Sequence, residues 1–351
     1  MSLFTCRKEV CFMNSTTENY TSKLGQYMSA YLEQQLNLGY KAEDIRFTLR
    51  TINHYLNTID FHGTYITKTV YESWLDTIKD QKATTIYSKV SVFIRFLKYM
   101  SGLGIECYIP RLPRKHDSGF VPYIYSQQEI ERIFQACDIL RMKERHAKSI
   151  LIIIPTLIRL LYSTAIRISE ALSIKNKDID FDRSVIVLNQ TKNGYQRLAP
   201  INKSLENVLK QYIEYRNKIP IDGIYDPDSN LFVSSIGQPC ARKTVLSYFH
   251  TILKEAGISY RGNQEGPRVH DIRHTACVHS LVKMTRAGKD IYCCLPMLSV
   301  FMGHKKVLDT EHYLRLTQEM YPELIQLDSS VTASINGVIK RSFLINSDGI
   351  L

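Results

Sequence analysis

A break that contains three prolines divides the sequence and limits what the chain can fold into. Residues 104–124 include the stretch YIPRLPRKHDSGFVP, whose prolines and glycine interrupt any regular helix or strand. A chain of 351 residues is long enough for two domains of ordinary size. We therefore expect a linker at 104–124 between a first domain at 20–103 and a second at 125–327, followed by a tail at 328–351.

The part before this linker has the apolar spacing of helices. Apolar side chains recur every three or four positions over residues 24–36, 45–59, 70–78 and 85–100. We find no strand pattern there. Four short amphipathic helices can bury their apolar faces against one another, so this part is expected to be a small helical bundle.

The part after the linker combines helices with one hairpin. Ser126 and Glu129 have the spacing of a capping box, and helical patterns follow to about residue 163 and again from about 204, 241 and 270. Between them, SVIVL and QRLAPI indicate two strands joined by the turn TKNG. The expected fold class of the whole chain is therefore mainly α with a small antiparallel β-sheet.

The charge of the chain favours an anionic partner. Its 45 basic and 34 acidic residues give a formal net charge of +11, which suits nucleic acid, although a basic protein without such a partner has the same composition. Eight scattered cysteines without a C-x-x-C pair indicate reduced thiols in the cytoplasm. The N-terminus has no apolar signal-peptide core, and Pro155 and Arg159 interrupt the most apolar run, so we expect a buried helix and no membrane partner.

One stretch near the end of the chain, RVHDIRHTACVHS, resembles a metal-binding helix at first sight. His270 and His274 stand four residues apart, as in the helix of a zinc hydrolase. Arg273 lies on nearly the same helical face, however, and its fixed charge would repel a divalent metal. Since a buried guanidinium without a partner is costly, an anion should meet it, either a phosphate or a nearby carboxylate. We therefore expect no metal at this stretch.

A phosphate site needs further cations, and three stand in comparable settings. Arg167 follows an apolar helix and precedes a new helix start, Lys192 lies in the hairpin turn, and His304 follows a glycine that ends a helix. Each has an ordinary alternative: Arg167 could pair with Glu170, and Lys192 could be solvated surface. Tyr313 comes nine residues after His304. Surrounding cations would lower the pKa of its phenol from about 10 and make it a nucleophile toward phosphorus.

In this order, the residues resemble the tyrosine recombinase (phage integrase) family over residues 126–320. The motifs are Arg in AIRISEAL, Lys in a hairpin, H-x-x-R-H, then G-H and a tyrosine nine residues later. The resemblance implies a two-domain DNA clamp, made of a helical core-binding domain and an α+β catalytic domain. The sequence departs from the family's pattern at two places. Ala-Ile precedes Arg167, where a glycine is common, and the segment between Arg273 and His304 is long. The extra residues, around KDIYCCLPMLSVFM, should enlarge a loop or helix and suggest recombinases of mobile elements.

The resemblance also implies a role for each residue. Tyr313 would attack the scissile phosphate and form a 3′-phosphotyrosine, while Arg167 and Arg273 hold the non-bridging oxygens. Lys192 would protonate the leaving 5′-oxygen, and His270 would assist as acid or base. His304 would donate a hydrogen bond to the phosphate, with Glu170 and His274 orienting these groups. Apart from the resemblance, three cations cluster in the expected linker, Arg111, Arg114 and Lys115, where they could cross a phosphate backbone; an ordinary solvated loop is the alternative.

The partners implied are double-stranded DNA at a recombination site and three further copies of the chain, as a homotetramer on two duplexes. The phosphotyrosine conserves the bond energy, so neither ATP nor a metal cofactor is expected. The tail at 328–351 could dock on a neighbouring copy. Such a protein would work in a prokaryotic cytoplasm, at the nucleoid. Type IB topoisomerase chemistry, or a DNA-binding relative that has lost catalysis, are the alternatives.

Overall fold

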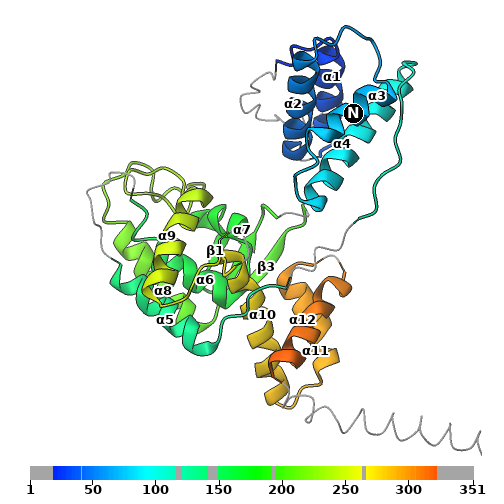
Figure 1. Cartoon of the computed structure of the whole chain (residues 1–351). Coiled ribbons are helices and arrows are strands. Elements are labelled where there is room, and N and C mark those ends of the chain that lie inside the picture. Colours follow the sequence, from blue (N-terminus) through cyan, green and yellow to red (C-terminus); the bar gives the residue numbers. More distant parts are fainter. Residues whose placement is uncertain are drawn as a thin grey trace, which may run out of the picture. The chain divides into compact units, whose positions relative to one another are not determined.

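The chain forms two compact units, Met1–Phe120 and Val121–Leu351 (Figure 1). The structure is a computed structural model, and it describes residues 19–40, 42–115, 121–140, 149–191, 194–262, 266–304 and 306–321. The division between the units falls inside the segment expected to be a linker. The tail at 328–351 lies outside the described residues.

The first unit is a bundle of helices, as its apolar spacing predicts. Thr67 begins the third helix by accepting a hydrogen bond from the Val70 N–H at 3.3 Å. Trp74 and Phe93 pack edge to face in the core, with ring centroids 4.7 Å apart. The helices described in this unit are α1 (Gly25–Asn37), α2 (Glu43–Thr58), α3 (Lys68–Asp76) and α4 (Ala83–Gly102).

The second unit is mostly helical, and its first helix begins at the predicted capping box. The Ser126 hydroxyl accepts from the Glu129 N–H at 3.1 Å, and the Glu129 carboxylate accepts from the Ser126 N–H at 2.8 Å. The segment around KDIYCCLPMLSVFM forms a helix of its own. The described helices are α5 (Gln127–Ile139), α6 (Ile154–Thr164), α7 (Ile168–Leu172), α8 (Lys203–Arg216), α9 (Arg242–Glu255), α10 (Val269–Arg286), α11 (Ile291–Met302) and α12 (Leu308–Met320).

A small antiparallel sheet of three strands confirms the predicted hairpin. The strands β2 (Val185–Leu188) and β3 (Arg197–Pro200) pair along their whole length, and β1 (Ile179–Asp180) adds to the other edge of β2. The β1 strand was not predicted separately, because two residues are too few to show alternation. Lys192, in the predicted turn, lies outside the described residues.

Helix α10 is the central element of the second unit. It packs against α6, α11 and α12, so it brings together segments that lie far apart in the sequence (Figure 1). The apolar run SILIIIPTLIRLLYSTAIR supplies α6, and most of the α6 side chains are buried, as expected. Over the described residues, no helix has the length and apolar character that crossing a membrane requires.

Candidate active site

Arg167 stands between two helices. Helix α6 ends at Ala165 in a left-handed conformation (φ 50°), and Arg167 is the extended residue before α7, where the sequence predicts a helix start. Its guanidinium donates to Glu170 Oε1 at 2.8 Å, and its backbone N–H donates to Oε2 at 2.9 Å. The structure therefore contains the ion pair between Arg167 and Glu170 that the sequence offers as an alternative. This pair holds the partly exposed side chain of Arg167 in place.

Glu170 also binds a second arginine, which sequence reasoning missed. Arg197 on β3 donates to Glu170 Oε2 at 2.7 Å and to the Phe301 carbonyl at 2.8 Å. Burial raises the pKa of the Glu170 carboxyl, but the Arg167 N–H and the two guanidiniums outweigh burial, so its pKa is lowered overall. A buried carboxylate thus links α7, β3 and the end of α11. The only local signal was an arginine within the apolar strand QRLAPI.

Arg273 lies on α10 and is 3 % exposed. It donates to the Ala165 carbonyl and to the Met302 carbonyl, each at 2.6 Å, and its NH2 lies 3.3 Å from His304 Nε2. No carboxylate forms an ion pair with Arg273 among the residues that the structure describes. Burial and then the charge of Arg167 lower the Arg273 pKa to about 10. The two helix-end carbonyls hold the guanidinium, and the carboxylate of Glu170 acts on it only through its charge, without an ion pair.

His304 follows Gly303, the left-handed residue (φ 65°) that ends α11. Its Nδ1 lies 2.8 Å from the Thr310 hydroxyl. Because Arg273 can only donate, His304 Nε2 must accept, which leaves the proton on Nδ1. Burial, Arg273 and Arg167 lower the His304 pKa to about 4, so the ring is neutral at neutral pH.

Tyr313 on α12 is buried, with 1 % exposure, and its hydroxyl lies 2.7 Å from His274 Nδ1. Its ring lies nearly parallel to that of His304, with centroids 6.2 Å apart. Burial raises the Tyr313 pKa above its ordinary value, and this effect exceeds the opposite effect of Arg273 and Arg167. The two arginines therefore act in the expected direction, but the expected net lowering of the pKa is wrong, because desolvation of the phenolate outweighs them.

His270 and His274 lie on the same side of α10, with their rings edge to face and centroids 4.9 Å apart. The His270 ring keeps some exposure to solvent, yet desolvation and the nearby guanidiniums, Arg273 first among them, lower its pKa to about 4. In the part of the chain that the structure describes, neither histidine pairs with a carboxylate. Within the described residues, no group of three or more His, Cys, Asp or Glu side chains could hold a metal ion.

The structure thus brings most of the predicted site residues together in the second unit. The linker cations belong to the first unit and are exposed, and nothing places them at this site. The residues that the structure joins through hydrogen bonds, ring contacts and electrostatic interactions are Arg167, Glu170, Arg197, His270, Arg273, His274, His304 and Tyr313.

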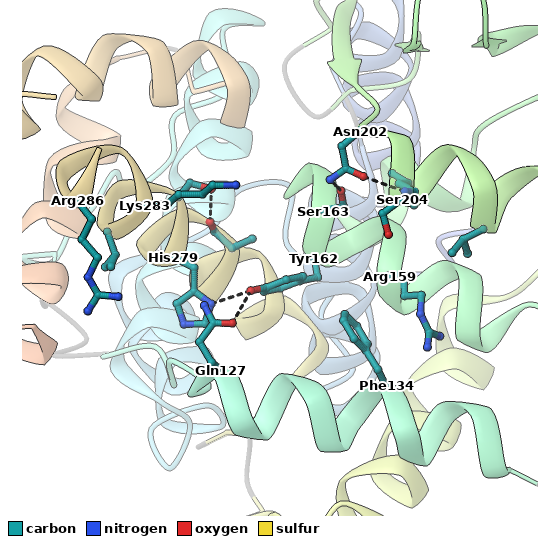
Figure 2. A pocket seen from close by; sticks show the side chains of 15 residues that line it. Gln127, Phe134, Arg159, Tyr162, Ser163, Asn202, Ser204, His279, Lys283 and Arg286 are labelled. Atoms are coloured by element: carbon teal, nitrogen blue, oxygen red, sulfur yellow. Dashed lines mark hydrogen bonds between the residues drawn. The ribbon is translucent and has the colours of Figure 1, made fainter. Parts of the chain in front are cut away.

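A separate pocket of about 700 Å³ lies between α5, α6, α8 and α10 (Figure 2). The Tyr162 hydroxyl lies 2.9 Å from His279 Nδ1 at its wall, next to Phe134. None of the site residues named above lines this pocket. It therefore provides positions for control substitutions in the same unit.

Chemically, the cluster suits attack by a tyrosine on an anionic phosphate. Two arginines can hold non-bridging oxygens, and the neutral histidines can exchange protons near the phenol. This defines a class of enzyme that breaks a phosphodiester through a covalent tyrosine ester.

The sequence profile of the Phage integrase family matches residues 124–320, which is more than half of the chain. The chain therefore belongs to this family, the tyrosine-type site-specific DNA recombinases. This match confirms the family resemblance, and the structure confirms the expected fold class, mainly α with a small antiparallel β-sheet. The topoisomerase and inactive-relative alternatives receive no support from the relatives.

Curated relatives align over most of the chain. The integrase/recombinase y4rB of Sinorhizobium fredii is 27 % identical over 87 % of this chain and 96 % of its own length. The tyrosine recombinase XerA of Pyrococcus horikoshii is 23 % identical over 80 % of this chain and 90 % of its own.

Solved structures share the fold. The XerH site-specific recombinase, bound to its difH substrate before cleavage, aligns with a TM-score of 0.60 at 16 % identity, over 87 % of this chain and 90 % of its own. The Tn1549 transposon integrase, in complex with transposon right end DNA, aligns with a TM-score of 0.56 at 18 % identity, over 84 % and 99 %.

Proposed function

We propose that the chain cuts double-stranded DNA with Tyr313 and rejoins it to a new partner strand. The observation that carries this proposal is the position of the Tyr313 hydroxyl, buried beside His274 in the same cluster as Arg273 and His304. The cluster lies within the part of the chain that matches the family.

The arginines would bind the scissile phosphate. The three hydrogen bonds of Arg273 use three of the five N–H groups of its guanidinium, which leaves donors for a non-bridging oxygen. Arg167, held by Glu170, would supply the second cation. With the proton on Nδ1, His304 would donate a hydrogen bond to the phosphate only after the ring is released from Thr310 or becomes protonated.

The reaction proposed is a transesterification. A bond forms between Tyr313 Oη and phosphorus while the bond to the 5′-oxygen breaks, and Lys192 gives the leaving oxygen a proton. His270 assists as acid or base. The 5′-hydroxyl of a partner strand then attacks the phosphotyrosine and releases Tyr313. Each ester replaces another of similar energy, so the exchange requires no ATP.

We further propose that the chain acts as a homotetramer on two duplexes, and that it serves a mobile element.

The cations of the linker would contact the phosphate backbone of the DNA. Their exposure in the structure and the net charge of +11 support this contact. The cations are Arg111, Arg114 and Lys115.

The test is a covalent adduct. A cognate duplex is selected by binding from DNA that flanks the gene, and a nick is placed so that the cleaved end diffuses away. The wild-type chain should form an SDS-stable protein–DNA adduct that survives excess EDTA. Tyr313→Phe should bind the duplex but form no adduct, whereas Tyr162→Phe, in the separate pocket, should form it normally. A wild-type chain that binds its site and forms no adduct would refute the function.

A further inference from the structure

We propose that His274 is the general base that accepts the phenolic proton of Tyr313 as the tyrosine attacks phosphorus. This role rests on the proposed cleavage by Tyr313. In this role His274 does more than orient its neighbours. It takes the proton of the Tyr313 hydroxyl, while a different group gives a proton to the leaving 5′-oxygen.

The geometry selects His274 among the nearby histidines. Its Nδ1 lies 2.7 Å from Tyr313 Oη, within the range of a direct proton transfer. His304 lies parallel to the tyrosine ring, and its two nitrogens contact Thr310 and Arg273. A base must be within hydrogen-bond reach of the proton it takes, and His304 is occupied elsewhere.

His270 and His312 are placed less well for this task. The ring of His270 meets the edge of the His274 ring, and His312 lies against the face of the tyrosine with centroids 3.8 Å apart. Neither forms a hydrogen bond with the Tyr313 hydroxyl among the described residues. His274 is therefore the described acceptor at the attacking oxygen.

The electrostatic surroundings keep His274 neutral in the resting site, and they also make it a weak base that needs nearby negative charge before it can hold a proton. Desolvation, His270, His312 and the guanidiniums of Arg273 and Arg268 lower its pKa to about 2, while the pKa of Tyr313 is raised. The phenol therefore donates to Nδ1 in the resting site, and free phenolate does not accumulate. A phosphate bound at Arg273 brings negative charge that stabilises an imidazolium, so proton transfer accompanies attack.

The step balances without an added reactant. The Tyr313 O–H proton moves to His274 Nδ1 as the Oη–P bond forms, and the P–O5′ bond breaks as the 5′-oxygen takes a proton from its own acid. During rejoining, the incoming 5′-hydroxyl loses its proton to that acid's conjugate base. The imidazolium of His274 then returns its proton to the departing phenol.

A pair of substitutions separates a base from a positioning residue. In His274→Asn, the side-chain oxygen can take the place of Nδ1 and accept the phenolic hydrogen bond, but it cannot hold the proton. If His274 is the base, His274→Asn and His274→Ala should both slow single-turnover cleavage on the order of 10²-fold or more. Recovery in His274→Asn to within about threefold of wild type would show positioning alone and overturn the proposal. His250→Asn is the matched control, because the His250 ring stacks on Tyr260 outside the site.

A modified substrate identifies the proton that His274 moves. When sulfur replaces the bridging 5′-oxygen, the leaving group needs no acid, so a variant that lacks the acid regains its cleavage rate. The His274 variants should remain slow on this substrate, and exogenous imidazole should accelerate His274→Ala. Rescue of His274→Ala by the sulfur substrate would place its role at the leaving group and overturn the proposal.

Two different results would refute the base and the cleavage reaction. Near-wild-type cleavage by both His274 variants, with an adduct that depends on Tyr313, would refute only the role of His274 as a base. The absence of an adduct with wild-type protein would refute cleavage by Tyr313 itself. Equal DNA binding and equal circular dichroism of the variants confirm that they are folded.

Discussion

Gly303 and Arg197 lie so close that no side chain fits between them. A Cβ placed on Gly303 would stand 2.5 Å from Arg197 Nε and 2.7 Å from its Cδ. Gly303 also has a φ of 65°, which L-residues rarely adopt. The glycine before His304 therefore does two things: it ends α11, and it lets Arg197 reach both Glu170 and the Phe301 carbonyl.

Gly303→Ala should weaken both the fold and the site. The left-handed conformation alone costs an L-residue about 1–2 kcal/mol, and displacement of Arg197 adds to this. Gly288→Ala is the matched control, because Gly288 has a φ of 79° but open space around it. Urea unfolding should show a larger loss for Gly303→Ala than for Gly288→Ala. Cleavage by Gly303→Ala should fall on the order of 10²-fold as His304 moves. Equal losses of stability would mean that Arg197 can move away from the added methyl group without further loss of stability.

The sequence could predict the parts of this site that depend on local geometry. The capping box at Ser126, the hairpin, and the helix start after Arg167 are all set by residues a few positions apart. The three-residue spacing of His270 and Arg273 likewise places them on one face as soon as the segment is helical.

The rest depends on tertiary contacts that no local pattern encodes. Arg197 meets Glu170 and the end of α11 only after β3, α7 and α11 have packed, so an arginine in a short strand gave no signal of its partners. The nearby cations alone predict a lowered pKa for Tyr313, and the direction is wrong because a list of cations does not show burial. His274 likewise became a partner of Tyr313 only when α10 and α12 came together.

Glu170→Gln should destabilise the protein in a pH-dependent way. Removal of one charge from a buried ion pair costs about 3 kcal/mol or more, and here two guanidiniums lose their counterion. The folded-state pKa of Glu170 is below its ordinary 4.5, so its contribution is complete above that pH and is lost as the pH falls through the lower, folded value. Unfolding measured at pH 7 and at progressively lower pH should show the difference between the two proteins shrinking. Glu214→Gln, in an exposed pair with Lys218, should change stability by less than about 1 kcal/mol at either pH.

Arg273→Lys should abolish most cleavage even though it preserves the charge. An ammonium group cannot reproduce a planar fork that reaches two carbonyls and a histidine at once. Loss of one such donor from a charge-stabilising site costs about 10²–10³ in rate. Single-turnover cleavage of the nicked substrate measures this loss. Arg159→Lys makes the same change at the Asp138 pair beside the separate pocket and should cleave at nearly the wild-type rate. Comparable rates for the two variants would contradict the assignment.

His304 should be neutral at pH 7, with its proton on Nδ1. Nitrogen-15 NMR of labelled histidines, assigned with His304→Gln, should show this tautomer and a titration near pH 4 rather than near the ordinary 6.5. Because the folded-state pKa is lower, protonation favours the unfolded chain. The contribution of His304 to stability is therefore complete above pH 6.5 and is lost as the pH falls toward 4. A proton on Nε2 at pH 7 would contradict the hydrogen bond from Arg273.

DNA binding should weaken steeply with salt, and the linker cations should carry part of that dependence. Each lost phosphate contact lowers the slope of log K against log salt by about 0.9. Replacement of the three exposed cations by Gln should therefore lower the slope by up to about 2.7 while adduct formation by the bound chain is retained. Lys218→Gln is the control, because the charge of Lys218 is already paired with Glu214 at 3.0 Å. A slope that the triple variant leaves unchanged would remove these residues from the DNA interface. They are Arg111, Arg114 and Lys115.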